Sequence, residues 1–166
     1  MIQFKNIFLF TFVLMLTACG YQLRGSIDLP EGLKSIYLQG GSAQLKKQMR
    51  RTLKSSGGQL VDKSRLAGLI VKIDNERMDR RVMSLSPTGR ASEYELIYQF
   101  DFTLLDKENK VLAEQQRIEI NKDYFNDQEE ILGKNNEEQV IRDEMYRKAV
   151  GSIVNRSRVV LEKLEK

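Results

Sequence analysis

The sequence predicts an α+β protein in which two helices pack on one face of a four-stranded mixed sheet, as a two-layer sandwich. Three patterns indicate this fold. One long segment alternates apolar and polar residues, two segments repeat apolar residues at helical spacing, and the elements follow the order strand, helix, three strands, helix. Helices at these points beside a small sheet give two layers, so we expect both helices on one face and the other face free.

The first strand and helix are expected within residues 35–55. Residues 35–38 form a short apolar strand, closed by two glycines. Ser42 then has the chemistry of a helix N-cap, because its hydroxyl accepts from early helix amides. The apolar stripe of this helix is Leu45, Met49 and Leu53. Gly57 and Gly58 follow and end the helix.

Three further strands are expected between residues 69 and 124. One begins at about Leu69, after which the chain turns polar and basic, and Pro87 marks the clearest turn. The strongest strand runs from Tyr94 to Leu104, whose aromatic stripe is more typical of a core than of a ligand site. A polar loop at 106–110 leads into the return strand.

The last third of the chain is expected to be one helix. Asn136 is the predicted N-cap, with Gln139 as its capping-box partner. The apolar side is formed by Ile141, Met145, Ala149 and Ile153, and it extends to Leu164. The acidic residues at 127–130 and 137–144 match no calcium-loop spacing, so no metal site is expected.

The N-terminus has the pattern of a bacterial lipoprotein signal. Lys5 supplies the charge, Ile7 to Leu16 supply the apolar run, and Cys19 follows a small residue. The alternatives are a transmembrane anchor, although about ten apolar residues are too few against roughly twenty, and an incidental thiol at Cys19. We therefore expect a signal peptide at 1–18, a lipidated tether at 19–31 and a single domain at 32–166.

The residue after the lipidated cysteine favours the outer membrane. Gly20 stands there, rather than the aspartate that commonly retains lipoproteins in the inner membrane. Several acyl chains on Cys19 would anchor the protein stably, because one chain alone binds a membrane only marginally. We expect the protein at the periplasmic face of the outer membrane.

The composition argues against catalysis. The chain has no histidine, and its single cysteine is assigned to lipid, so the commonest general base, thiol nucleophile and zinc ligands are absent. We expect a protein that is not an enzyme and has no cofactor. The net charge is +4 and the pI about 9.1; for an exported protein this favours anionic lipid or an acidic protein surface over nucleic acid.

Basic residues gather in two places. The first predicted helix carries a cationic side, which is either a solvated surface or a contact for phosphates or an acidic partner; its residues are Lys46, Lys47, Arg50, Arg51 and Lys54. Arg77, Arg80, Arg81 and Arg90 surround the turn at Pro87. Arginines bind phosphate through paired N–H groups, but charges at strand edges also prevent aggregation.

Three segments resemble the LPS-assembly lipoprotein LptE family. They are Cys19-Gly20-Tyr21-Gln22-Leu23-Arg24-Gly25, Ala91-Ser92-Glu93-Tyr94-Glu95-Leu96, and Ile131-Leu132-Gly133-Lys134-Asn135-Asn136-Glu137-Glu138 with Ile141-Arg142-Asp143-Glu144-Met145-Tyr146 after it. The resemblance covers the chain in order. It implies two helices on a four-stranded sheet and a non-enzymatic role in lipopolysaccharide export.

The resemblance also implies partners and a site. Members of the family sit as a plug in the outer-membrane barrel LptD, support its assembly and bind lipopolysaccharide. Lys134 matches one family position associated with that binding. The other lies before the hairpin turn, where this chain has Ser86-Pro87, so Arg90 just after the turn is its expected substitute, with Arg80 or Arg81 beside it. The rival interpretation is a lipoprotein that binds peptidoglycan or scaffolds another envelope complex.

Overall fold

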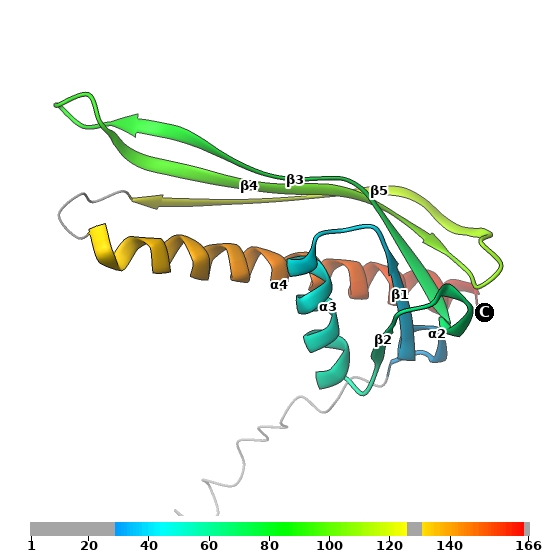
Figure 1. Cartoon of the computed structure of the whole chain (residues 1–166). Helices are drawn as coiled ribbons and strands as arrows, with labels where there is room; N and C mark the ends of the chain where they lie inside the picture. The colour runs from blue at the N-terminus through cyan, green and yellow to red at the C-terminus, as the bar shows by residue number, and fades with distance from the viewer. Residues whose placement is uncertain (1–28, 126–130, 165–166) are drawn as a thin grey trace, which may run out of the picture.

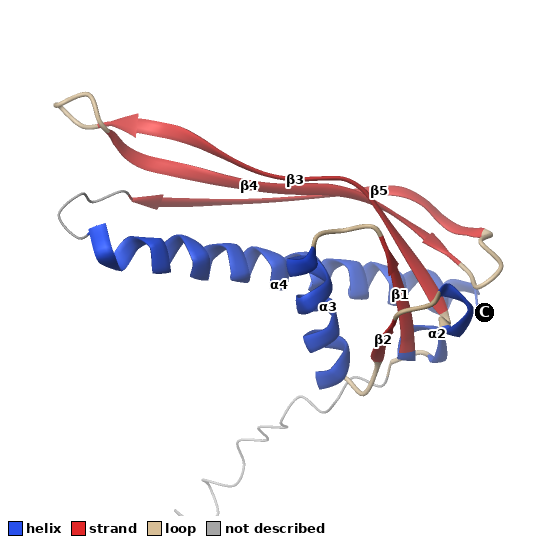
Figure 2. Ribbon diagram, viewed as in Figure 1, coloured by secondary structure: helices blue, strands red, loops and turns tan. Residues whose placement is uncertain are grey.

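The computed structural model describes residues 29–125 and 131–164, with the backbone alone at 131–136. One layer is a five-stranded sheet in the order β2-β1-β3-β4-β5, and the two main helices lie on one side of it (Figure 1, Figure 2). β1 runs parallel to both β2 and β3, whereas β3, β4 and β5 are antiparallel neighbours. In chain order the elements are α2 (Glu31–Lys34), β1 (Ser35–Gln39), α3 (Ala43–Ser55), β2 (Gln59–Val61), η1 (Ser64–Leu66), β3 (Leu69–Leu85), β4 (Ala91–Leu105), β5 (Val111–Phe125) and α4 (Ile131–Leu164).

The core lies between the sheet and the helices, which confirms that both main helices cover the same face. Its strand residues alternate along each long strand, and its helix residues are the two predicted stripes. The largest fully buried side chains include Tyr98, Phe100 and Phe102 of β4. A small second cluster around Ile70 and Leu105 lies on the opposite face, which is otherwise polar.

The local signals around α3 are confirmed. The Ser42 hydroxyl accepts a hydrogen bond from Leu45 N at 3.2 Å, as an N-cap does. The helix ends at Ser55, and Gly57 has φ +77°, a left-handed conformation that glycine adopts without steric cost. Gly58 N then donates to Leu53 O at 2.8 Å.

A bulge interrupts β3. The register shifts between Asp74 and Arg77, where Asn75 and Glu76 together oppose Phe100 of β4. Asn75 has φ +55°, which is the left-handed conformation that asparagine tolerates better than most residues. Because one extra residue is inserted, the side chains beyond the bulge exchange faces. Odd-numbered residues face the helices before the bulge, and even-numbered residues do so after it as far as Val82, where the register shifts again.

The bulge turns the Glu76 carboxylate toward the start of α3. Glu76 accepts hydrogen bonds from Ser42 N at 2.5 Å, from Ser42 Oγ at 2.7 Å and from the Tyr98 hydroxyl at 2.7 Å. A carboxylate also suits the positive end of the helix dipole. This contact therefore joins β3, β4 and α3 at one point, and burial raises the pKa of the Tyr98 hydroxyl, with the Glu76 hydrogen bond adding to the shift.

Three sequence-based expectations are corrected. The sheet has five strands rather than four, because β2 pairs with β1 over only three residues, too few for an alternating pattern to show. β3 continues through its polar stretch to Leu85, since its backbone stays paired with β4 on both sides of the bulge. α4 begins at Ile131, so Asn136 lies inside the helix and is not its cap.

The N-terminal expectations fall mostly outside the described residues. The signal peptide, Cys19 and the tether up to residue 28 are among these. The described chain begins at Leu29, which is buried in the core, and α2 begins at Glu31. Among the described helices none is long and apolar enough to cross a membrane.

Replacing Glu76 with alanine should destabilise the protein by about 2 kcal/mol, because the buried Tyr98 hydroxyl and the Ser42 amide lose their shared acceptor. Urea unfolding followed by circular dichroism measures the loss. The matched control is Asp74→Ala, whose half-exposed ion pair with Lys72 is worth under about 1 kcal/mol. Equal losses in the two variants would contradict a special role for Glu76.

Candidate functional site

The β3–β4 hairpin, the last residues of β5 and the start of α4 lie at the same end of the molecule, on the left of Figure 1. We call this the distal end. β5 finishes at Phe125 opposite Glu93, whereas the hairpin is paired up to Leu85 and Ala91. The hairpin therefore projects beyond β5 as the tip of the sheet.

The hairpin turn forms at Pro87, where the sequence predicts it. Ser86 N donates to Arg90 O at 2.7 Å, and Gly89 N donates to Ser86 O at 2.9 Å. Gly89 adopts φ +77°, which a residue with a Cβ would adopt only with strain. Arg90 closes this turn and is exposed at the tip.

Arg80 lies on the helix face of β3, within a polar network. Its guanidinium is 3.3 Å from Glu138 Oε2 of α4 and 4.7 Å from the centre of the Tyr94 ring. Tyr124 of β5 donates to the same Glu138 oxygen at 2.5 Å, and Arg142 donates to the other oxygen at 2.6 and 2.8 Å. Glu138 therefore connects three elements at the distal end.

The network controls the charge of Glu138. Partial burial opposes ionisation, but the hydrogen bonds from Tyr124 and Arg142, with the charges of Arg142 and Arg80, outweigh it and hold the pKa of Glu138 below its ordinary value. Burial, reinforced by the bond to Glu138, raises the pKa of Tyr124. Arg80 thus faces a permanent carboxylate at neutral pH.

Arg81 lies on the opposite face of the sheet from Arg80. It forms an ion pair with Glu95 of β4, whose carboxylate is buried although it belongs to the outer face. Arg81 and Arg80 are sequence neighbours on a strand, so their side chains point to opposite sides. The two arginines do not form one anion site.

The four predicted binding residues therefore separate into two groups. Arg90 is at the hairpin, and the backbone of Lys134 is in the first turn of α4, so both belong to the distal end. The Lys134 side chain lies outside the described residues. Arg80 and Arg81 lie farther back along β3, each already paired with a carboxylate.

The distal end also exposes large apolar side chains, which sequence reasoning missed. Phe125 is 73% exposed and Leu85 is 64% exposed, and Val82 and Met83 beside them are about half exposed. The signal for them is the apolar content of Val82-Met83-Ser84-Leu85, which follows the basic stretch of β3. Apolar and cationic groups side by side suit an amphiphilic anion.

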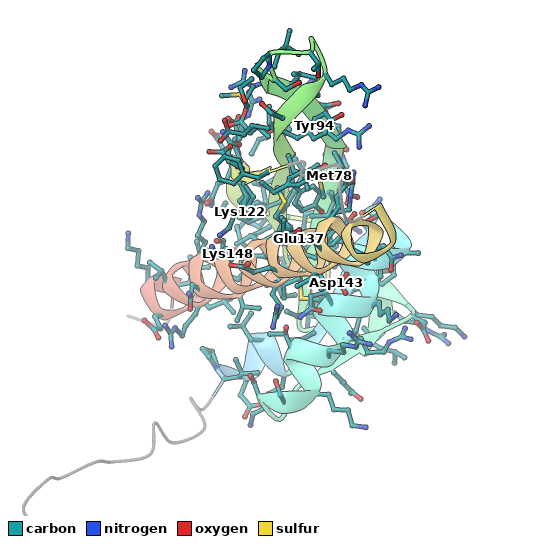
Figure 3. All side chains as sticks on the ribbon, turned by 90° about the vertical axis from the view of Figure 1, so that its left-hand side faces the viewer. Met78, Tyr94, Lys122, Glu137, Asp143 and Lys148 are labelled. Atoms are coloured by element: carbon teal, nitrogen blue, oxygen red, sulfur yellow. The ribbon has the colours of Figure 1, made fainter. Side chains whose placement is uncertain are left out.

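A second ion-pair contact joins β5 to α4. Lys122 Nζ is 3.4 Å from Glu144 Oε1, and Lys148 Nζ is 3.1 Å from the same oxygen. Figure 3 looks onto the distal end, with Met78 and Tyr94 on the strands above α4 and Lys122 on β5 beside them. The layer between the sheet and the first half of α4 is thus built largely from charged and tyrosine side chains. No group of acidic, histidine or cysteine side chains among the described residues is arranged to hold a metal.

The Glu138 network predicts a pH-dependent stability. Because the pKa of Glu138 is lowered by folding, its carboxylate stabilises the protein above the ordinary value of 4.5, and this contribution is lost as the pH falls through the lowered pKa. E138Q should lower the free energy of unfolding by about 1 kcal/mol at pH 7. This difference from the wild type should disappear below pH 4.5. Urea unfolding across this pH range measures it, with E137Q, on the exposed neighbour, as the control. A deficit that stays constant with pH would assign the effect to packing.

Comparison with known proteins identifies the relatives of this chain. The family model described as "LptE: Lipopolysaccharide-assembly" matches residues 33–157. Proteins named LPS-assembly lipoprotein LptE are similar: one from Photorhabdus laumondii is 22% identical, covering 86% of this chain and 78% of its own, and one from Yersinia enterocolitica is 26% identical, covering 89% and 72%.

Two solved structures share the fold. The solution structure of an uncharacterized lipoprotein B from Nitrosomonas europaea aligns with a TM-score of 0.70 at 26% identity, covering 86% of this chain and 93% of that one. The crystal structure of the rare lipoprotein B from Shewanella oneidensis aligns with a TM-score of 0.65 at 25% identity, covering 80% and 99%. Since the family model matches well over half of the sequence, the chain belongs to the LptE family of lipopolysaccharide-assembly proteins.

Proposed function

We propose that this protein is an outer-membrane lipoprotein that binds lipopolysaccharide during its export and that plugs, and supports the assembly of, an LptD-like β-barrel. The family match over residues 33–157 carries the proposal. In this role the protein binds and positions lipid and catalyses no reaction. It is anchored through lipid on Cys19 at the periplasmic face.

The distal end supports the binding part of the proposal. Lipopolysaccharide carries phosphates beside acyl chains, and the distal end combines Arg90 and Lys134 with the exposed apolar residues Leu85 and Phe125. An arginine fork binds phosphate through two N–H groups, and a lysine acts as a point charge. Arg80 and Arg81 act indirectly, because their carboxylate partners already neutralise them and hold β3 in place.

The outer face of the sheet supports the plug part of the proposal. Beyond its small apolar cluster this face is polar, with Lys72, Asp101, Arg117 and Glu119 along the long strands. The interior of a large outer-membrane barrel is polar, so such a face can lie inside one with its charges solvated or paired. The bulge in β3 opens a surface cavity of about 420 Å³ here, lined in part by Arg77 and Arg117.

Charge reversal at the distal end tests lipopolysaccharide binding. R90E with K134E should weaken binding by at least tenfold, since two attractive contacts become repulsive, while the unfolding midpoint stays near that of the wild type. Equilibrium binding of purified lipopolysaccharide to detergent-solubilised protein measures this. K107E with K110E, at the opposite hairpin, is the matched control. Unchanged binding by R90E/K134E would remove the site assignment.

Purification in mild detergent tests the partner. We expect the protein to co-purify with one large β-barrel in a fixed ratio that survives 0.5 M salt, because a plug buries far more surface than a transient contact. Binding to isolated peptidoglycan with no barrel recovered would favour the scaffold alternative.

A further inference from the structure

The basic side of α3 has no role in the proposed function. Five of the thirteen residues of α3 are basic and none is acidic. The five are exposed and span roughly 140° of the helix circumference at 100° per residue, away from the buried stripe; they are Lys46, Lys47, Arg50, Arg51 and Lys54.

These charges are largely uncompensated. Within the described residues their one ion pair is Arg50 with Asp62, at 3.5 Å and with both side chains mostly exposed. Arg51 and Arg147 of α4 line a surface cavity of about 380 Å³, which also includes Asp143. The basic surface therefore continues from α3 onto α4, where Asp143 also lines the cavity. A surface of one sign creates a positive potential, which attracts an anionic partner.

The chain leading to Cys19 begins beside this helix. Leu29 is buried next to Gly58, since a Cβ placed on Gly58 would lie 3.1 Å from Leu29 Cδ1. Gly58 is itself bonded to Leu53, in the last turn of α3. Leu29 lies ten positions after Cys19, which gives a reach of at most about 35 Å, and α3 is about 20 Å long.

We propose that the basic side of α3 docks on anionic phospholipid headgroups of the membrane that holds the Cys19 lipid. This rests on the lipid anchor of the proposed function. The anchor keeps the end of α3 within reach of the headgroup layer, so docking is intramolecular and occurs at high effective concentration. Each Lys or Arg near an anionic surface strengthens binding about fivefold. The anchor fixes the distance of the domain from the membrane, and α3 fixes its orientation.

The test uses the full lipidated protein in vesicles of phosphatidylcholine alone or with phosphatidylglycerol at three parts in ten. An amine-reactive reagent labels exposed lysines, and mass spectrometry gives the rate at each. We expect phosphatidylglycerol to slow the labelling of Lys46, Lys47 and Lys54 several-fold and to leave Lys107 and Lys110 unchanged. Salt at 0.5 M should remove the protection, because it screens charges beyond about 5 Å.

Two variants sharpen this test. R50Q/R51Q keeps the three reporter lysines and should lose most of their protection, since two cations contribute about 25-fold. K107Q/K110Q removes the same number of charges at the opposite hairpin, and this variant should keep the protection of the three reporter lysines. Equal labelling in both vesicles overturns the proposal, and so does protection that appears only when a barrel protein is present, which would indicate an acidic protein partner. Flotation with phosphatidylcholine vesicles reports the anchor separately, so failure of the anchor is distinguishable from failure of docking.

Discussion

The bulge at Asn75 and Glu76 determines how the rest of the structure is arranged. By inserting one residue opposite Phe100 it exchanges the faces of β3. Without it, Arg81 rather than Arg80 would face α4. The same bulge brings the Glu76 carboxylate to Ser42 and so fixes the start of α3 against the sheet. One local irregularity thus sets both the position of the helix and the chemistry of the strand beyond it.

The contact between the sheet and α4 changes from charged to apolar side chains along the helix. Met145 and Ile153 are buried in an apolar core, whereas Glu138 and Glu144 hold α4 to the strands through ion pairs and hydrogen bonds. Phe125 follows the helix-facing Tyr124 on β5, so it points to the outer face of the sheet, where it is exposed. The basic residues behind the net charge of +4 are of two kinds. Among the described residues, the arginines of β3 are paired with carboxylates, whereas the basic residues of α3 mostly are not.

Sequence by itself determined the features whose causes are local. The cap at Ser42, the stripe of α3, the alternation from Tyr94 to Leu104 and the turn at Pro87 each depend on residues a few positions apart, and all are present in the structure. The resemblance to the LptE family, rather than any local pattern, indicated Arg90 together with Lys134, and Arg90 and the backbone of Lys134 lie at the distal end. The exposure of the apolar residues near Leu85 does not follow from the sequence, because the register of β3 shifts within Val82-Met83-Ser84-Leu85 and breaks the alternation there.

Only the tertiary structure decided which charges are available. Glu138 lies 58 positions from Arg80 in the sequence, so no local pattern indicates that they pair. The bulge shifts the alternation of β3 by one, so an alternation extrapolated from Leu69, Val71 and Ile73 assigns Arg80 and Arg81 to the wrong faces. The three-residue strand β2 exists only because β1 is beside it. Partners distant in sequence determine each of these features, because strand pairing and burial of charge depend on what the fold brings alongside.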